Sequence, residues 1–190
     1  MEPLVGDGLC IRPYRDEDAP QFVAAVREST ASVGLWMPWC HPDYSLDEAL
    51  AWFALCRSNM ENRLAWDVGI FSAHETTGGA SVFHGGIGIN QISRLYNYGN
   101  LGYWIRASSQ GRGLAARAAR MMARYGFGEL GLTRLEIVAI EDNHASRRTA
   151  EKAGASFECV ARNRLVLHGE PRDAAVYSLV PGQSGRPARR

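Results

Sequence analysis

Apolar residues recur with helical spacing in the segment that begins at Leu114. The later positions follow the first by 4, 7, 8 and 11 residues, and the set is Leu114, Ala118, Met121, Met122 and Tyr125. This spacing places them on one face of a helix. Another face carries Arg117, Arg120 and Arg124. The pattern predicts an amphipathic helix with its apolar face against a core.

Capping residues predict two more helices. Ser45 is followed three residues later by Glu48, which together form a capping box ahead of an apolar periodic segment. Asn143 caps a helix that ends at Gly154, with Lys152 in its last turn. These two helices flank the central part of the chain.

Runs of apolar and β-branched residues predict seven strands, near residues 9–12, 64–71, 81–92, 101–105, 134–140, 157–167 and 174–180. Pro13 ends the first strand, and a helix from Asp16 to about Arg27 follows it. A turn at 168–171 separates the last two strands. The order β-α-α-β-β-β-α-β-α-β-β has too few βαβ units for a doubly wound sheet. We therefore predict an α+β (mixed α/β) fold, with helices on both faces of a mixed sheet.

Composition is that of an ordinary globular domain. The chain has 190 residues, of which 46% are hydrophobic and 22% charged, which fits a single domain with a sizeable core. The formal net charge of +1 gives no reason to expect a nucleic-acid or anionic-membrane partner. No segment approaches the ~20 apolar residues of a membrane span.

The four cysteines, Cys10, Cys40, Cys56 and Cys159, form no C-x-x-C pair and lie at no zinc-finger spacing from a histidine. We therefore expect no metal site. The N-terminus has neither the basic start nor the long apolar run of a signal peptide. Reduced thiols in a cytoplasmic protein are the expectation.

The most informative segment is Gln110-Gly111-Arg112-Gly113-Leu114-Ala115, which joins a predicted strand to the amphipathic helix. Glycines let the backbone approach a ligand closely and adopt positive φ. The first turn of the helix offers free N–H groups and the positive end of the helix dipole. Together these features predict a site for a phosphate or pyrophosphate group.

Three interpretations of this segment compete. The glycines could serve only a strand–turn–helix corner. Residues 111–116 also match the relaxed G-x-G-x-x-A dinucleotide fingerprint, but too few residues follow to build both halves of that fold. A Walker loop is excluded because no G-K-[ST] follows. The third interpretation is a site for the pyrophosphate arm of coenzyme A.

The chain resembles the GNAT acetyltransferase superfamily, whose acetyl-CoA loop [QR]-x-x-G-x-[GA] is matched by 110–115. The resemblance extends over roughly residues 8–180 and is greatest to the RimJ/RimL-type branch. The other matching segments are Leu9-Cys10-Ile11-Arg12-Pro13, Asp16-Glu17-Asp18-Ala19, Gly102-Tyr103-Trp104-Ile105, Asn143-His144-Ala145-Ser146, Glu151-Lys152-Ala153-Gly154-Ala155, and Gly169-Glu170-Pro171-Arg172-Asp173 with Tyr177.

This resemblance implies a GNAT fold, a mostly antiparallel twisted sheet of six to seven strands with helices on both faces. It implies one domain at 1–180 and a C-terminal tail at 181–190. The implied activity is acetyl transfer from acetyl-CoA to a primary amine, such as a protein N-terminus. Acetylation of a small amine or antibiotic, and a non-catalytic acetyl-CoA-binding module, remain alternatives. The expected partner is the amine acceptor, and a homodimer stays open.

The resemblance also assigns coenzyme contacts. The backbone N–H groups of Gly111, Gly113, Leu114 and Ala115 are expected to bind the pyrophosphate, and Gln110 to shape the loop. Arg112 either pairs with a phosphate or is a solvated surface residue. The helix arginines either form a solvated face or supply one contact to the 3′-phosphate. The backbone of Trp104 and Ile105 is expected to pair with pantetheine amides in a local gap of the sheet.

Asn143 is expected to bond the pantetheine arm as well as to cap its helix. Ser146 is the candidate acid that protonates the leaving thiolate, or else fills space in the helix.

The general base is harder to assign, because this chain departs from the resemblance: Asn100 stands where many members of the family carry a glutamate, and Leu165 where some RimL-type enzymes do. The remaining candidates for the base are Glu136, His84 and Asp67. Residues 36–42, which contain two tryptophans and two prolines, could line the acceptor slot or cover the sheet edge.

Overall fold

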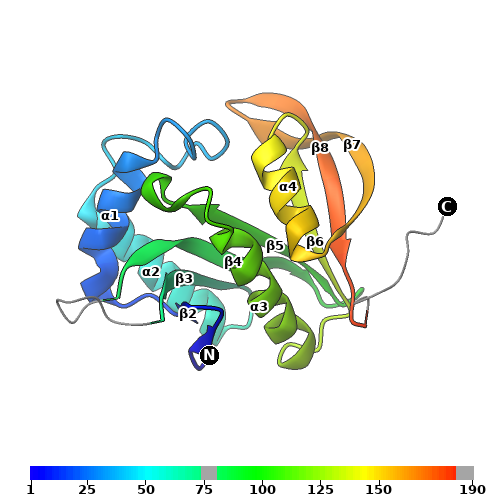
Figure 1. Ribbon diagram of the computed structural model, residues 1–190, viewed down its shortest axis with the longest axis horizontal. Helices are drawn as coiled ribbons and strands as arrows, with labels where there is room; N and C mark the ends of the chain where they lie inside the picture. Colours follow the sequence, from blue (N-terminus) through cyan, green and yellow to red (C-terminus); the bar gives the residue numbers. More distant parts are fainter. Residues whose placement is uncertain (74–80, 183–190) are drawn as a thin grey trace.

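A computed structural model describes residues 1–73 and 81–182 of the chain, and it contains one sheet covered on both faces by helices (Figure 1). The strand order is β1-β2-β3-β4-β5-β6-β8-β7, and all neighbours are antiparallel except β5 and β6. The strands are β1 (Leu4–Gly6), β2 (Leu9–Arg12), β3 (Trp66–Ser72), β4 (Phe83–Ser93), β5 (Tyr98–Ile105), β6 (Arg134–Ile140), β7 (Ser156–Leu167) and β8 (Glu170–Leu179).

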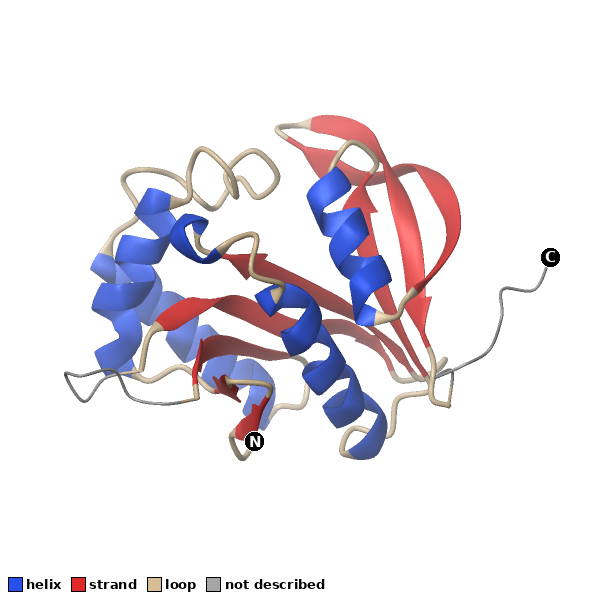
Figure 2. Cartoon of the chain, viewed as in Figure 1, coloured by secondary structure: helices blue, strands red, loops and turns tan. Residues whose placement is uncertain are grey.

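Two helices cover each face of the sheet (Figure 2). One apolar cluster joins α1 (Ala19–Glu28) and α2 (Leu46–Glu61) to the sheet, and the other joins α3 (Leu114–Gly128) and α4 (His144–Ala153) to the opposite face. Two 3₁₀ turns, η1 (Asp16–Asp18) and η2 (Ala107–Ser109), precede α1 and α3. The predicted α+β class with helices on both faces is confirmed.

The predicted helix caps are present. The backbone N–H of Glu48 donates to Ser45 Oγ at 3.2 Å, and the Ser45 N–H donates to the Glu48 carboxylate at 2.8 Å. Asn143 Oδ1 accepts from the N–H of Ser146 at 3.0 Å, and Gly154 ends α4 with φ of 94°. Each cap satisfies groups that a helix end leaves without an intrahelical partner.

The described residues form eight strands, one more than the upper end of the predicted six to seven. The additional strand is β1, whose three residues are too short to show a periodic pattern. Strand β8 begins at Glu170 rather than near residue 174, so Pro171 lies inside a strand instead of the predicted turn. Pro171 is tolerated there because β6 pairs with β8 only from Ala174 onward, which leaves that end of β8 with one neighbour.

The sheet divides between β5 and β6. These parallel strands pair only at Tyr98–Arg134, Gly99–Leu135 and Asn100–Glu136. Farther along, β5 stays with β4 as far as Ile105, whereas β6 stays with β8 as far as Ile140 (Figure 1). We call this divergence the seam, and it provides the local gap in the sheet that the sequence comparison anticipated.

The predicted tail at 181–190 falls largely outside the described residues, which end at 182. The domain boundary at residue 180 therefore stays a prediction. Within residues 1–73 and 81–182, no helix combines the length and apolarity needed to cross a bilayer.

Candidate functional site

A cavity of about 600 Å³ lies at the seam, and we call it the seam cavity. Residues of β5, the η2–α3 loop, α3 and α4 line it, together with residues 31–33 and 35–37 of the α1–α2 connection. Nine of the ten predicted site residues are among them: Trp104, Ile105, Gln110, Gly111, Gly113, Leu114, Ala115, Asn143 and Ser146. Segments that are far apart in the chain thus meet around one space.

The loop before α3 presents backbone to the seam cavity. Gly111 and Gly113 have φ of 74° and 70°, and apart from their own chain neighbours no atom of the described residues lies within 4 Å of the position that a Cβ would occupy on either. Gly113 is the N-cap of α3, and no side chain of the described residues caps this helix, so its first-turn N–H groups are available to an anion. The loop fits a diphosphate because it combines open space, donors and the positive end of the helix dipole.

The side chain of Gln110 fixes the beginning of this loop. Its Nε2 donates to the carbonyl of Ile105 at 2.9 Å and to Ser32 Oγ at 3.2 Å. It therefore ties the loop both to the end of β5 and to the connection that follows α1.

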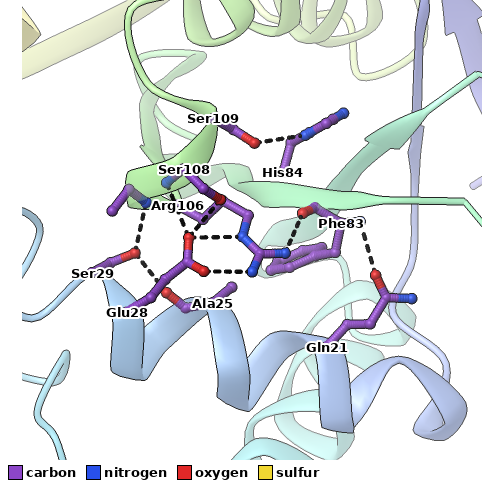
Figure 3. Close-up of polar contacts among 10 residues, drawn as sticks. Gln21, Ala25, Glu28, Ser29, Phe83, His84, Arg106, Ser108 and Ser109 are labelled. Carbon is purple, nitrogen blue, oxygen red and sulfur yellow. Dashed lines mark hydrogen bonds and ion pairs between the residues drawn. The ribbon is translucent and has the colours of Figure 1, made fainter.

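A polar network attaches the end of α1 to the η2 turn (Figure 3). Glu28 accepts from Arg106 Nη2 at 2.6 Å and from both the N–H and the hydroxyl of Ser108. The pKa of Glu28 is lowered to about 2, chiefly by the Arg106 hydrogen bond. Ser29 Oγ accepts from the Ala107 N–H at 2.9 Å. The carboxylate therefore stays ionised at neutral pH and holds the turn in place.

The arginines of the loop and of α3 have separate positions. Arg112 is exposed and does not line the seam cavity. Arg117 donates to the carbonyl of Asp7 at 2.6 Å, and Arg120 donates to that of Lys152 at 2.8 Å. These contacts give Arg117 and Arg120 structural roles, so contacts from the arginines to phosphate remain predictions.

Ser146 lies in the first turn of α4, beside a tyrosine of β5. The Tyr103 hydroxyl donates to the Ser146 carbonyl at 3.0 Å and lies 3.4 Å from Ser146 Oγ. Burial raises the pKa of Tyr103 to about 12. Two hydroxyl groups, both neutral at physiological pH, therefore meet at the side of the seam where α4 begins.

A second cavity, of about 340 Å³, lies on the α1–α2 face of the sheet, and we call it the aromatic cavity. It borders the seam cavity at Met37, Tyr103 and Trp104, which line both. Its other lining residues are Tyr14, Phe22, Trp39, Tyr44, Trp52, Asp67, Gly86, Ile87, Gly88, Asn90 and Gly102. The predicted slot loop thus contributes Trp39 here and Trp36 to the seam cavity.

Of the three remaining base candidates, only Asp67 lines the aromatic cavity. His84 is buried, and its Nδ1 lies 3.0 Å from Ser109 Oγ behind the η2 turn. Glu136 accepts from Arg134 at 3.0 Å and lines neither cavity. Asn100 donates to Asn90 Oδ1 at 3.0 Å.

Sequence reasoning missed Tyr103 as a site residue and missed the glycines of β4. Gly86 and Gly88 alternate along that strand, so both face the aromatic cavity. A Cβ on Gly86 would lie 2.7 Å from Tyr14 Oη, so the missing side chain lets the hydroxyl approach the sheet. Alternating glycines in a strand are the signal that could have revealed this surface.

The chain belongs to the acetyltransferase (GNAT) domain family, whose model matches residues 8–156. One relative is the "Putative ribosomal N-acetyltransferase YdaF" of Bacillus subtilis, 33% identical over 96 residues. That match covers 50% of this chain and 52% of the relative, so it spans about half the length of each. The spermidine N(1)-acetyltransferase of Escherichia coli K12 is 29% identical over 84 residues, 44% of this chain and 45% of that protein.

Solved structures resemble the whole chain. A structure described as "a putative ribosomal-protein-serine acetyltransferase from Vibrio cholerae" has a TM-score of 0.78 and 29% identity, covering 95% of this chain and 98% of that one. A RimL structure in complex with coenzyme A has a TM-score of 0.82, covering 94% and 98% of the two chains. At 19% identity, that likeness shows the fold. Within the described residues no cluster of three or more histidine, cysteine or acidic side chains could hold a metal ion.

Proposed function

We propose that this protein transfers an acetyl group from acetyl-CoA to a primary amine. The observation that carries the proposal is the meeting of two cavities at Tyr103 and Trp104. One cavity offers a diphosphate-binding loop and an open strand edge, and the other is a space lined with apolar groups. A thioester in the first and an amine in the second would meet at their border.

The residues that line the seam cavity support coenzyme A as its ligand. The loop at 111–115 would hold the pyrophosphate through backbone N–H groups. The edge of β5 at Trp104 and Ile105, which β6 leaves open, would pair with the pantetheine amides. Asn143 and Ser146 would lie near the thioester, since both line the cavity from the beginning of α4.

The chemistry then needs few groups. The amine nitrogen attacks the thioester carbon, and the coenzyme leaves as a thiol. Ser146 would donate a proton to the departing sulfur, with the Tyr103 hydroxyl 3.4 Å from its Oγ. Holding the amine against the thioester supplies much of the rate by itself.

The acceptor is proposed as a primary amine, and two classes have support. Relatives named as ribosomal-protein acetyltransferases favour a protein N-terminus. A confined aromatic cavity of about 340 Å³ favours a small amine, as does the spermidine acetyltransferase relative. In either case the nucleophile enters from the α1–α2 side of the sheet.

Turnover of acetyl-CoA over a panel of amines tests this proposal. The panel contains peptide N-termini, polyamines, aralkylamines and aminoglycosides, and thiol release is measured. Thiol release that depends on one of the amines, with the acetylated product found by mass spectrometry, is the expected result. Tight acetyl-CoA binding without turnover of any amine would instead support the non-catalytic binding module.

A further inference from the structure

Strand β5 carries no carboxylate that could receive the amine proton, and Asn100 stands where the family resemblance implies a glutamate. Among the described residues that line the aromatic cavity, one carries a carboxylate, Asp67 of β3. The other residues that line this cavity are aromatic residues, glycines, an isoleucine, a methionine and an asparagine. An acceptor-only group in such surroundings needs a donor to offset its loss of water.

Few protein groups offset the buried charge of the Asp67 carboxylate. Asn90 Nδ2 donates to its Oδ1 at 3.2 Å, and among residues 1–73 and 81–182 no arginine, lysine or histidine forms an ion pair with it. Burial raises the pKa of Asp67, which makes it a stronger base than an exposed aspartate. The carboxylate therefore retains capacity for a ligand N–H group.

The register of the sheet brings this carboxylate close to the border between the cavities. Asp67 pairs with Gly88, and Gly88 pairs with Gly102 of β5. A Cβ on Gly88 would collide with Asp67 Oδ1, so the carboxylate lies above Gly88 on β4 rather than above its own strand. Adjacent strands lie about 4.8 Å apart, which leaves the carboxylate roughly one strand spacing from β5.

The attacking amine would lie at the border between the two cavities, about one strand spacing from the Asp67 carboxylate. Tyr103 follows Gly102 and lines both cavities, so an amine that attacks the thioester must lie above this part of β5. A nitrogen there is within reach of Asp67 directly or through one water molecule. The amides of Asn100 and Asn90 form a chain that ends on the same carboxylate and orients it.

The geometry points to Asp67 as the catalytic base for an amine carried on an apolar body, an inference that rests on the proposed acetyl transfer. The amine lone pair forms the new N–C bond, the C–S bond breaks, and its electron pair leaves with sulfur. The nitrogen gives one proton to the Asp67 carboxylate, and the sulfur takes one from the Ser146 hydroxyl. Water then removes the proton from Asp67 and returns one to Ser146.

Other ionisable groups facing Asp67 do not compete for this role. Tyr14 precedes η1 and Cys56 belongs to α2, and burial raises the pKa of both far above neutrality. Burial also raises the pKa of Tyr44, in the connection before α2, to about 12. All three remain protonated at the pH at which Asp67 must be ionised.

Asp67→Asn is the direct test, assayed with the panel amine of highest wild-type kcat/KM. We expect kcat to fall at least about a hundredfold, with an unchanged dissociation constant for acetyl-CoA by calorimetry. The wild-type kcat/KM falls as pH drops through the Asp67 pKa, and the variant should lack that decline. The exposed Glu61→Gln is the matched control and should retain wild-type kinetics.

Thermal unfolding separates catalysis from structure. Because burial disfavours the Asp67 charge, Asp67→Asn should melt at or above the wild-type temperature. Gly88→Ala is a second variant: its methyl group displaces the carboxylate without removing it, and we expect kcat to fall about tenfold.

Four results would overturn the inference. One is a kcat for Asp67→Asn within about threefold of wild type. A second is a large loss in Glu136→Gln instead. A third is an Asp67→Asn effect confined to KM for a diamine, which would make Asp67 an anchor for a distal ammonium group. Finally, absence of wild-type turnover with every amine would overturn the proposed function and this inference with it.

Discussion

The two cavities that meet at Tyr103 and Trp104 are built in different ways. The part of the seam cavity that we propose for the diphosphate comes largely from one continuous stretch, 104–115, which offers backbone N–H groups and glycines. The aromatic cavity collects side chains from both helices of one face, three strands and the connection before α2. A site made of backbone leaves a short motif in the sequence, whereas a site made of scattered side chains leaves none.

The strongest test of this contrast is Gly113→Asp. Two like charges about 4 Å apart near a protein surface repel by about 4 kcal/mol, so acetyl-CoA affinity should fall about a thousandfold. Calorimetry measures the loss, and Gly113→Asn is the matched control, since asparagine tolerates positive φ and carries no charge. Unchanged affinity in a folded Gly113→Asp protein would place the phosphates elsewhere.

Ser146→Ala tests whether a side chain at the border between the two cavities takes part in the chemistry. We expect kcat to fall about a hundredfold, because the departing sulfur loses its proton donor. Acetyl-CoA binding should change little, since alanine keeps the backbone N–H that Asn143 caps. Steady-state kinetics of Ser146→Ala, Tyr103→Phe and the double variant measure how far the two hydroxyl groups act together. A kcat for Ser146→Ala within about twofold of wild type would leave catalysis to positioning alone.

Acetyl-CoA should stabilise the folded protein. At about 100 times its dissociation constant a ligand adds about 2.7 kcal/mol, which raises the melting temperature of a domain of this size by roughly 5–10 °C. Differential scanning fluorimetry measures the shift, and an acceptor amine alone should shift it less. A melting curve that saturating acetyl-CoA leaves unmoved would contradict the assignment of the seam cavity.

The smallest expected effect concerns the polar network in which Glu28 attaches the end of α1 to the η2 turn. Glu28→Gln removes the charge that holds Arg106 and the Ser108 N–H, which should cost about 1–2 kcal/mol of folding stability. The lowered pKa of Glu28 means that this stability is present above about pH 4.5 and is lost as pH falls toward 2. Denaturant unfolding of Glu28→Gln, with the exposed Glu17→Gln as control, measures it. Equal stability of the two variants at pH 7 would show that the network contributes no net stability.

Much of the fold was predictable because local signals agree with it. Ser45 and Asn143 act locally as caps, and the apolar face of α3 repeats often enough to identify a helix. The start of β5 was less accessible, since Asn97, Gly99 and Asn100 read as turn residues although β5 begins at Tyr98. Pairing with β4 and β6 overrides their weak strand propensity, and pairing is a long-range property.

The candidate site also contains residues that the sequence predicts and residues that it does not. The loop at 110–115 was predicted from its motif and Asn143 from the family resemblance, and both line the seam cavity. The position of Asp67 depends on the register across three strands and on a missing side chain at Gly88. Neither condition is visible within the few residues around Asp67, so sequence alone could offer it only as one candidate among three.

The three residue pairs that join β5 to β6 also determine how the backbone exchanges with solvent. Beyond Asn100, no strand of residues 1–73 or 81–182 pairs with the edge of β5 that faces the seam, whereas its other edge is bonded to β4 as far as Ile105. Amide protons along this segment should therefore alternate between slow and fast deuterium uptake in the free protein. A ligand that occupies the seam would slow the fast set only, so a mass or NMR record of that alternation would report occupancy residue by residue, without any catalytic assay.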